Sequence, residues 1–179
     1  MGNKEVTQFF ENNAQSWVLN GYNDDGYNYP TALHRSRIIK KILKSKKNKL
    51  KIVDLGCGAG NVTIMLAKLG HKIIVLDNLS SGRFSNLSKV KNKIKFVNVD
   101  ISNNKKSIKK YFKGVDWVFH LAGLADIVPS IINPKPYFKA NVKGTQNILE
   151  ISKDVKIKKL IYAASASCYG IPDKFPIKE

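Results

Sequence analysis

Residues 51–77 read KIVDLGCGAGNVTIMLAKLGHKIIVLD, and this stretch decides the fold. It opens and closes with short apolar runs of the β-branched kind that suits parallel strands covered on both faces. Between them, three alternating glycines, Gly56, Gly58 and Gly60, precede a helix-length segment. A glycine turn beside a helix N-terminus lets a ligand approach the backbone closely, because the Cβ atoms are missing. The stretch therefore predicts a strand-helix-strand unit with a ligand-binding turn.

The same alternation continues beyond this unit. It predicts an α/β fold: a Rossmann-like, doubly wound parallel sheet with strand order 3-2-1-4-5. We expect an N-terminal helical leader over residues 1–50, with an amphipathic helix at 31–47, and a nucleotide-binding domain over residues 51–179. The expected strands lie at 51–55, 72–77, 94–100, 115–123 and 158–165, and the expected helices at 61–70, 85–93, 104–114 and 137–155.

Composition argues against several classes of protein. The chain has 179 residues, enough for one domain with a sizeable core, and no apolar run approaches the roughly 18 residues of a membrane span. The net charge is +18, but only three of the 31 basic residues are arginine, so we expect no specific nucleic-acid site. Two cysteines and three scattered histidines predict neither a disulfide framework nor a metal site. We expect a cytoplasmic protein that binds no membrane.

The spacing of the glycines points to one class of cofactor. A dinucleotide-binding turn has glycines at G-x-G-x-x-G, but Asn61 or Thr63 stands where the last glycine belongs. The form D-x-G-x-G-x-G, with Asp54 at the strand end, resembles motif I of class I S-adenosylmethionine-dependent methyltransferases. Residues 1–76 as a whole are similar to that family. The resemblance implies a loop that wraps the methionine part of S-adenosylmethionine, with Asp54 near its amino end.

A second resemblance begins at Asp77. Four stretches in order resemble the extended short-chain dehydrogenase/reductase family, and within it the NAD-dependent nucleotide-sugar epimerases and dehydratases of the UDP-glucose 4-epimerase kind. The stretches are DNLSSGRFSNL (77–87), VNVDI (97–101), VFHLAGLADIVPSIINPKPYFKANVKGTQNILE (118–150) and LIYAASASCYGIPDKFPIKE (160–179). This resemblance implies NAD as the cofactor and a nucleotide-sugar as the second ligand.

The second resemblance also implies roles for individual residues. Asp77 would hold the adenosine ribose hydroxyls, and Ser165 would hydrogen-bond the reacting oxygen of the sugar. The other implied cofactor residues are Asn78 beside Asp77, Asp100 and Ile101 at the adenine, Leu121, Ala122 and Gly123 after the fourth strand, and Asn141 in the following helix. A plainer interpretation stays open, in which the two acids only end strands and Asn141 is a polar residue satisfied within a helix.

Two features depart from the epimerase/dehydratase pattern. The family's opening phosphate loop, TGGAGFIG, is replaced by the loop at 54–61. The family's catalytic Tyr-x-x-x-Lys pair is missing as well. The residues four places after Tyr111, Tyr137, Tyr162 and Tyr169 are Val115, Asn141, Ala166 and Asp173. That tyrosine is the general base for hydride transfer, so Ser165 belongs to an incomplete catalytic site.

The two patterns would join near residues 66–77, because both families use a second strand that ends in a ribose-binding acid. Three hypotheses stay open: a truncated hybrid of the epimerase/dehydratase family with little or no turnover, an S-adenosylmethionine-binding protein or methyltransferase, and a non-catalytic binding module. The glycine loop favours S-adenosylmethionine as the cofactor, whereas the later motifs favour NAD. A truncated sheet would expose apolar surface, which predicts a homodimer or a partner chain that covers it.

Overall fold

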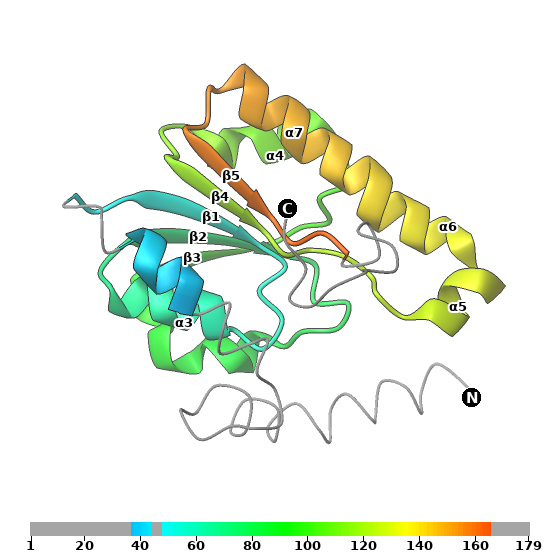
Figure 1. Cartoon of the computed structure of the whole chain (residues 1–179), viewed down its shortest axis with the longest axis horizontal. Helices are drawn as coiled ribbons and strands as arrows, with labels where there is room; N and C mark the ends of the chain where they lie inside the picture. The colour runs from blue at the N-terminus through cyan, green and yellow to red at the C-terminus, as the bar shows by residue number, and fades with distance from the viewer. Residues whose placement is uncertain (1–36, 44–47, 166–179) are drawn as a thin grey trace, which may run out of the picture.

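The computed structural model of the chain describes residues 37–43 and 48–165, and a five-stranded sheet forms their centre (Figure 1). Every neighbouring pair of strands is parallel, and the order is β3-β2-β1-β4-β5. The strands are β1 (Lys51–Leu55), β2 (Lys72–Asp77), β3 (Ile94–Asn98), β4 (Trp117–His120) and β5 (Lys159–Tyr162). The predicted Rossmann-like α/β fold and its strand order are confirmed.

Helical segments cover both faces of the sheet (Figure 1). They are α3 (Asn61–Lys68), α4 (Lys105–Lys109), α5 (Ile127–Ile132), α6 (Pro134–Tyr137) and α7 (Thr145–Asp154), with 3-10 segments η1 (Phe84–Lys93) and η2 (Lys110–Phe112) and a π-helical segment η3 (Phe138–Gly144). α6, η3 and α7 follow one another as one helical run, of which the predicted helix at 137–155 is the larger part. α5 is not among the elements that the sequence pattern predicts.

The sheet separates two apolar layers, because side chains alternate between its faces along each strand. Ile52 and Phe119 share one layer with Leu66 of α3. Val53 and Val118 share the other layer with buried residues of α4 and α7. Burial on both faces explains why the strand sequences are almost continuously apolar. It also leaves the carboxyl edge of the sheet as the place where open α/β sheets bind ligands.

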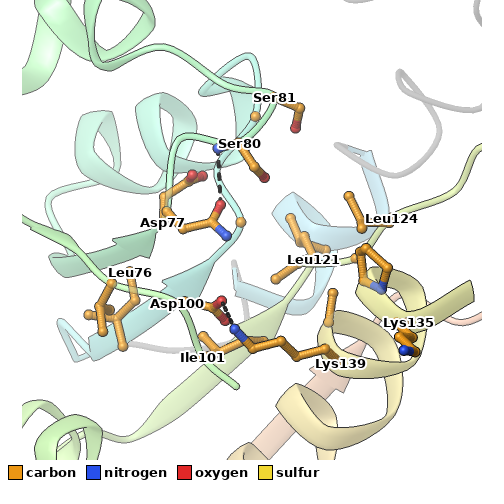
Figure 2. A pocket seen from close by; sticks show the side chains of 18 of the residues that line it. Leu76, Asp77, Ser80, Ser81, Asp100, Ile101, Leu121, Leu124, Lys135 and Lys139 are labelled. Atoms are coloured by element: carbon orange, nitrogen blue, oxygen red, sulfur yellow. Dashed lines mark hydrogen bonds and ion pairs between the residues drawn. The ribbon is translucent and has the colours of Figure 1, made fainter. Parts of the chain in front are cut away.

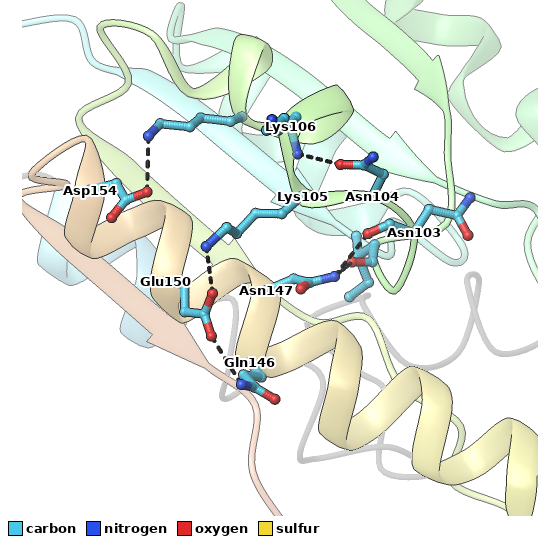
Figure 3. Close-up of polar contacts among 10 residues, drawn as sticks. Asn103, Asn104, Lys105, Lys106, Gln146, Asn147, Glu150 and Asp154 are labelled. Atoms are coloured by element: carbon cyan, nitrogen blue, oxygen red, sulfur yellow. Dashed lines mark hydrogen bonds and ion pairs between the residues drawn. The ribbon is translucent and has the colours of Figure 1, made fainter.

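Two ion pairs join α4 to α7 on the outside of the second layer (Figure 3). The Nζ of Lys105 lies 2.6 Å from Oε2 of Glu150, and the Nζ of Lys109 lies 2.9 Å from Oδ2 of Asp154. The four side chains are between 39% and 45% exposed. Water therefore screens these ion pairs, and each pair adds little to stability. The apolar contacts beneath them therefore hold α4 and α7 on the sheet.

Part of the predicted N-terminal leader belongs to the core of the sheet. Residues 37–43 are helical, and Ile39, Leu43 and Leu50 are buried in the layer that contains α3. Ile38 is exposed, since the helix turns residues 39 and 43 inward. The rest of the predicted helix at 31–47 lies outside the described residues, and the domain boundary at residue 50 stays a prediction.

No helix within residues 37–43 and 48–165 is long and apolar enough to cross a membrane. Large apolar side chains are nevertheless exposed on α5 and along the helical run that follows it. They are Ile127, Val128, Ile131, Ile132, Phe138, Val142 and Leu149. The sequence predicts exposed apolar surface at the edge of a truncated sheet, whereas these side chains lie on helical segments. Burial of apolar surface by a second copy or a partner chain stays a prediction.

Candidate functional site

A cavity of about 680 Å³ opens at the carboxyl edge of the sheet, a volume in the range of small-molecule sites. The ends of β1, β2 and β4 form one side of it, and α6 and η3 form the facing wall (Figure 2). Nine residues that the sequence predicts as cofactor contacts line this cavity: Gly56, Gly58, Asp77, Asn78, Asp100, Ile101, Leu121, Ala122 and Gly123. The topology therefore brings most of the predicted site together.

Asp77 ends β2 and ties it to the glycine turn. Its Oδ2 accepts a hydrogen bond from the backbone N–H of Cys57 at 2.8 Å, and its Oδ1 accepts one from the backbone N–H of Leu79 at 2.7 Å. Asp77 is only 7% exposed, yet it lines the cavity. These bonds hold the carboxylate in one orientation, and each oxygen keeps a second lone pair for a ligand. Burial, followed by the charge of Asp77, raises the pKa of the Cys57 thiol, so this thiol stays protonated.

The three glycines of the turn serve different purposes. A Cβ on Gly56 would lie 2.4 Å from the Cα of Ala122, and one on Gly60 would lie 2.8 Å from Cδ2 of Leu87. These two glycines therefore make room for other parts of the protein. At Gly58 no atom of the described residues lies within 4 Å of the Cβ position, and φ is +50°. Gly56 and Gly58 both line the cavity, and of these two only Gly58 has open space at its Cβ position.

Asp54 lies beneath the turn and does not line the cavity. It is fully buried, and its Oδ2 accepts a hydrogen bond from Oγ1 of Thr63 on α3 at 2.5 Å. Its Oδ1 has no hydrogen-bond partner within the described part of the chain. Burial raises the pKa of Asp54 to about 6, although the Thr63 hydrogen bond opposes this shift. In the structure, Asp54 joins β1 to α3, and its predicted contact with a cofactor has no counterpart in the cavity lining.

Asp100 follows β3 and joins the facing wall across the cavity (Figure 2). Its Oδ1 accepts hydrogen bonds from the backbone N–H and the Oγ of Ser102, at 2.8 and 2.6 Å. Its Oδ2 lies 3.2 Å from Nζ of Lys139 in η3. Burial works to raise the pKa of Asp100, but the Ser102 and Lys139 interactions together outweigh it and hold this pKa below its ordinary value. Asp100 therefore stays charged, and its charge is paired with that of Lys139.

Asn141 fastens the loop that follows β4. Its Oδ1 accepts a hydrogen bond from the backbone N–H of Leu124, and its Nδ2 donates one to the carbonyl of Leu124, both at 2.8 Å. Gly123 packs beside this pair, since a Cβ there would lie 3.2 Å from Asn141 Oδ1. Asn141 does not line the cavity, but Leu124 and Gly123 do. The structure makes Asn141 a positioning residue for the loop, and its partner is this loop rather than its own helix.

Ser165 and His120 lie near the carboxyl ends of β5 and β4. Ser165 is exposed and does not line the cavity. His120 is fully buried, with its Nε2 2.9 Å from Oγ1 of Thr145, and its Nδ1 has no partner among the described residues. Burial lowers the pKa of His120 to about 4, so the ring is neutral at pH 7. The cavity lining includes neither side chain.

Sequence reasoning missed the lysines of the facing wall. Lys135 of α6 and Lys139 of η3 both line the cavity, and their spacing of four residues places them on one helix face (Figure 2). The spacing of these lysines in NPKPYFK was the available signal. Lysine is so frequent in this chain that such a pair is not distinctive in the sequence.

The fold and the cavity define a class of protein: doubly wound, Rossmann-like α/β proteins with a cavity where the strands end and an acid at the end of the second strand. A comparison with protein families makes this more specific. Residues 56–179 match the model of the NAD dependent epimerase/dehydratase family. The chain belongs to that family.

Individual relatives agree with this assignment. The chain is 35% identical over 127 residues to the putative UDP-glucose 4-epimerase of Methanocaldococcus jannaschii, covering 68% of this chain and 41% of that protein. A solved epimerase of Methanothermobacter thermautotrophicus is 32% identical with a TM-score of 0.67, covering 79% of this chain and 43% of that one. The UDP-glucose 4-epimerase of Bifidobacterium longum, solved with NAD+ and UDP, is 27% identical with a TM-score of 0.63, covering 72% and 41%. The chain thus spans about two fifths of the length of these relatives.

The family match corrects the interpretation of the glycine loop. It starts at Gly56, inside the loop, and extends across residues 66–77, where the sequence predicts a join of two families. The comparisons support no methyltransferase segment and give no support for S-adenosylmethionine. The misleading signal has a physical cause. Gly56 and Gly60 are needed because Ala122 and Leu87 approach them closely, so their spacing reflects packing within the protein rather than the identity of a cofactor.

Proposed function

We propose that this chain binds NAD in the cavity at the carboxyl edge of the sheet, as the nucleotide-binding part of a nucleotide-sugar epimerase or dehydratase. The proposal rests mainly on the position of Asp77. This residue lines the cavity, and its carboxylate accepts hydrogen bonds from the backbone N–H groups of Cys57 and Leu79. An acid after the second strand suits the hydroxyls of an adenosine ribose. Because both oxygens are already oriented, little further ordering is needed when the ligand binds.

The rest of the cavity suits the other parts of a dinucleotide. Gly58 offers open backbone for the close approach of a pyrophosphate, as a glycine turn beside a helix N-terminus does. Val99 and Ile101 supply apolar surface on the side of Asp100, where an adenine would lie. When bound, NAD supplies the nicotinamide ring that accepts and returns a hydride. The residues of this chain bind the dinucleotide and orient it.

A nucleotide-sugar is the second ligand that we propose. Support comes from the family and from the relative that was solved with UDP. The resemblance assigns Ser165 to the reacting oxygen of the sugar. No tyrosine in the 179 residues is followed four places later by lysine, so the pair that would work with Ser165 is absent from this sequence. We therefore propose that the 179-residue chain by itself binds its ligands but shows little or no turnover.

Calorimetric titration of the chain with NAD, and separately with S-adenosylhomocysteine, tests the proposed function. We expect NAD to bind and S-adenosylhomocysteine not to bind. We expect Asp77→Ala to abolish NAD binding. Asp116→Ala is the matched control, because Asp116 also accepts a backbone N–H, from Lys51, but does not line the cavity. The absence of NAD binding to the unaltered chain, or binding of S-adenosylhomocysteine alone, would overturn the proposal.

A further inference from the structure

The cavity wall carries two carboxylates and two lysines, and three of these four side chains have polar partners. Asp77 accepts two backbone hydrogen bonds, and Asp100 is paired with Lys139 at 3.2 Å. Lys135 is the fourth, and within the described residues it makes no hydrogen bond or ion pair. Lys135 is an exposed residue of the cavity lining, and its positive charge has no acidic partner among the described residues.

The backbone around Lys135 is stiff. It stands between Pro134 and Pro136 at the start of α6, and each proline ring fixes its φ near −65°. Lys139, one turn later, turns toward Asp100 from the same wall (Figure 2). The base of the Lys135 side chain thus has a set position at the cavity, and only its own rotamers need ordering when an anion binds.

We infer that Lys135 binds the diphosphate of the nucleotide that occupies this cavity. The inference rests on the proposed function, because NAD and nucleotide-sugars both contain a diphosphate. Residues 54–61, the glycine loop, contain no lysine or arginine, so this loop can offer a diphosphate only backbone N–H groups. The carboxylates of Asp77 and Asp100 repel an anion. A lysine ammonium attracts phosphate as a point charge, and Lys135 is the lysine of the described wall whose charge is not shared with an acid.

Three titrations with the 179-residue chain and its Lys135→Gln variant test this inference. The ligands are NAD, UDP and adenosine, which has no phosphate. Lys143→Gln is the control, because it removes one lysine from η3 outside the cavity lining. We expect Lys135→Gln to weaken the binding of NAD or UDP by about 5- to 10-fold. This loss of affinity is larger than that from removing an exposed ion pair and smaller than that from removing a hydrogen bond to a charged group. The loss should shrink as salt is raised. Adenosine binding and the Lys143→Gln variant should be unchanged.

The ligands separate the two possible sources of the diphosphate. A loss with NAD assigns Lys135 to the cofactor, a loss with UDP assigns it to the nucleotide-sugar, and either result supports the inference. Unchanged NAD and UDP affinities in Lys135→Gln would overturn the inference and leave the proposed function standing. An equal loss with adenosine, or in Lys143→Gln, would also overturn it. If the unaltered chain binds neither NAD nor UDP, the proposed function fails and the inference fails with it. Equal thermal unfolding midpoints exclude misfolding of the variants.

Discussion

Oδ2 of Asp77 lies 2.8 Å from the backbone nitrogen of Cys57, so the end of the second strand is bonded directly to the turn that follows the first. The backbone N–H of Gly56 reinforces this connection, donating to the carbonyl of Leu76 at 3.0 Å. The candidate ribose acid and the open glycine turn therefore form one rigid unit built on the pairing of β1 with β2. The folding of the sheet alone sets the positions of both.

Replacing Asp77 by alanine should lower stability as well as binding. The N–H groups of Cys57 and Leu79 would lose their acceptor, and we expect the free energy of unfolding to fall by about 2 to 4 kcal/mol. Urea unfolding measures this loss. Asp116→Ala should cost less, because Asp116 lies nearer the surface and accepts one backbone N–H. Equal stability of the unaltered chain and Asp77→Ala would show that the hydrogen bonds of Asp77 to the backbone do not stabilise the fold.

The glycines of the turn should respond differently to alanine. Gly56→Ala places Cβ 2.4 Å from the backbone of Ala122, which cannot move without shifting β4, and we expect a loss of about 4 kcal/mol or failure to fold. Gly58→Ala meets no described atom but has φ at +50°, so we expect a loss of only about 1 kcal/mol. Its methyl group would face the cavity and weaken NAD binding. Thermal unfolding measures the stability of both variants, and titration with NAD measures the affinity of Gly58→Ala. Similar losses of stability in the two variants would contradict the different roles of Gly56 and Gly58.

Asp54 and His120 should give opposite pH dependences of stability. Burial raises the pKa of Asp54 from 3.8 to about 6 and lowers the pKa of His120 from 6.5 to about 4. Between pH 4 and pH 6, folded Asp54 keeps a proton that the unfolded chain has lost, so its contribution to the free energy of unfolding falls as pH rises. Folded His120 lacks a proton that the unfolded chain binds, so its contribution rises. Each effect is on the order of 3 kcal/mol, and the two largely cancel.

A variant that lacks one of these two groups shows the pH dependence of stability that the other group causes. Asn in place of Asp54 can still accept the Thr63 hydrogen bond, and relative to the unaltered chain Asp54→Asn should gain stability as pH rises from 4 to 6. His120→Gln should lose stability over the same range. The lowered pKa of His71 acts equally in all three proteins and drops out of these differences. Urea unfolding at pH 4, 5 and 6 measures these differences. If the stability of the unaltered chain and of both variants changed in parallel with pH, the opposite effects of Asp54 and His120 would be contradicted.

Two asparagines of the same helical run should separate positioning of the cavity loop from general stability. Asn141 bonds the backbone of Leu124, whereas Asn147 bonds the carbonyls of Ile101 and Asn103 through its Nδ2 (Figure 3). We expect alanine at either position to lower the free energy of unfolding by about 1 to 2 kcal/mol. Asn141→Ala should weaken NAD binding more than Asn147→Ala does, because Asn141 alone bonds the cavity loop at Leu124, whereas the segment at Ile101 keeps the hydrogen bonds between Asp100 and Ser102. Equal NAD affinities of the two variants would contradict this assignment.

The residues of the candidate site differ in how far the sequence could reveal them. Asp77, Asp100 and the segment 121–123 each follow an apolar strand, and parallel strands end at one edge of a sheet, so their meeting could be predicted. Asp54 also ends a strand pattern, but its side chain points toward Thr63 in the helical layer. Asp54 is paired with Val75 and Phe119 inside the sheet, and a position near the end of a strand does not by itself show whether a side chain reaches the cavity or the helical layer.

The sequence by itself determined the fold, because the regular alternation of apolar strands with helical segments leaves few ways to bury both faces of a parallel sheet. It also determined that polar residues would gather at the carboxyl edge. Only the tertiary structure decided what each of them contacts. Gly56 meets Ala122, and Lys139 reaches Asp100 while Lys135 faces the cavity. These contacts join residues far apart in the chain, and their distances depend on how helices and loops pack onto the sheet, which no local pattern records.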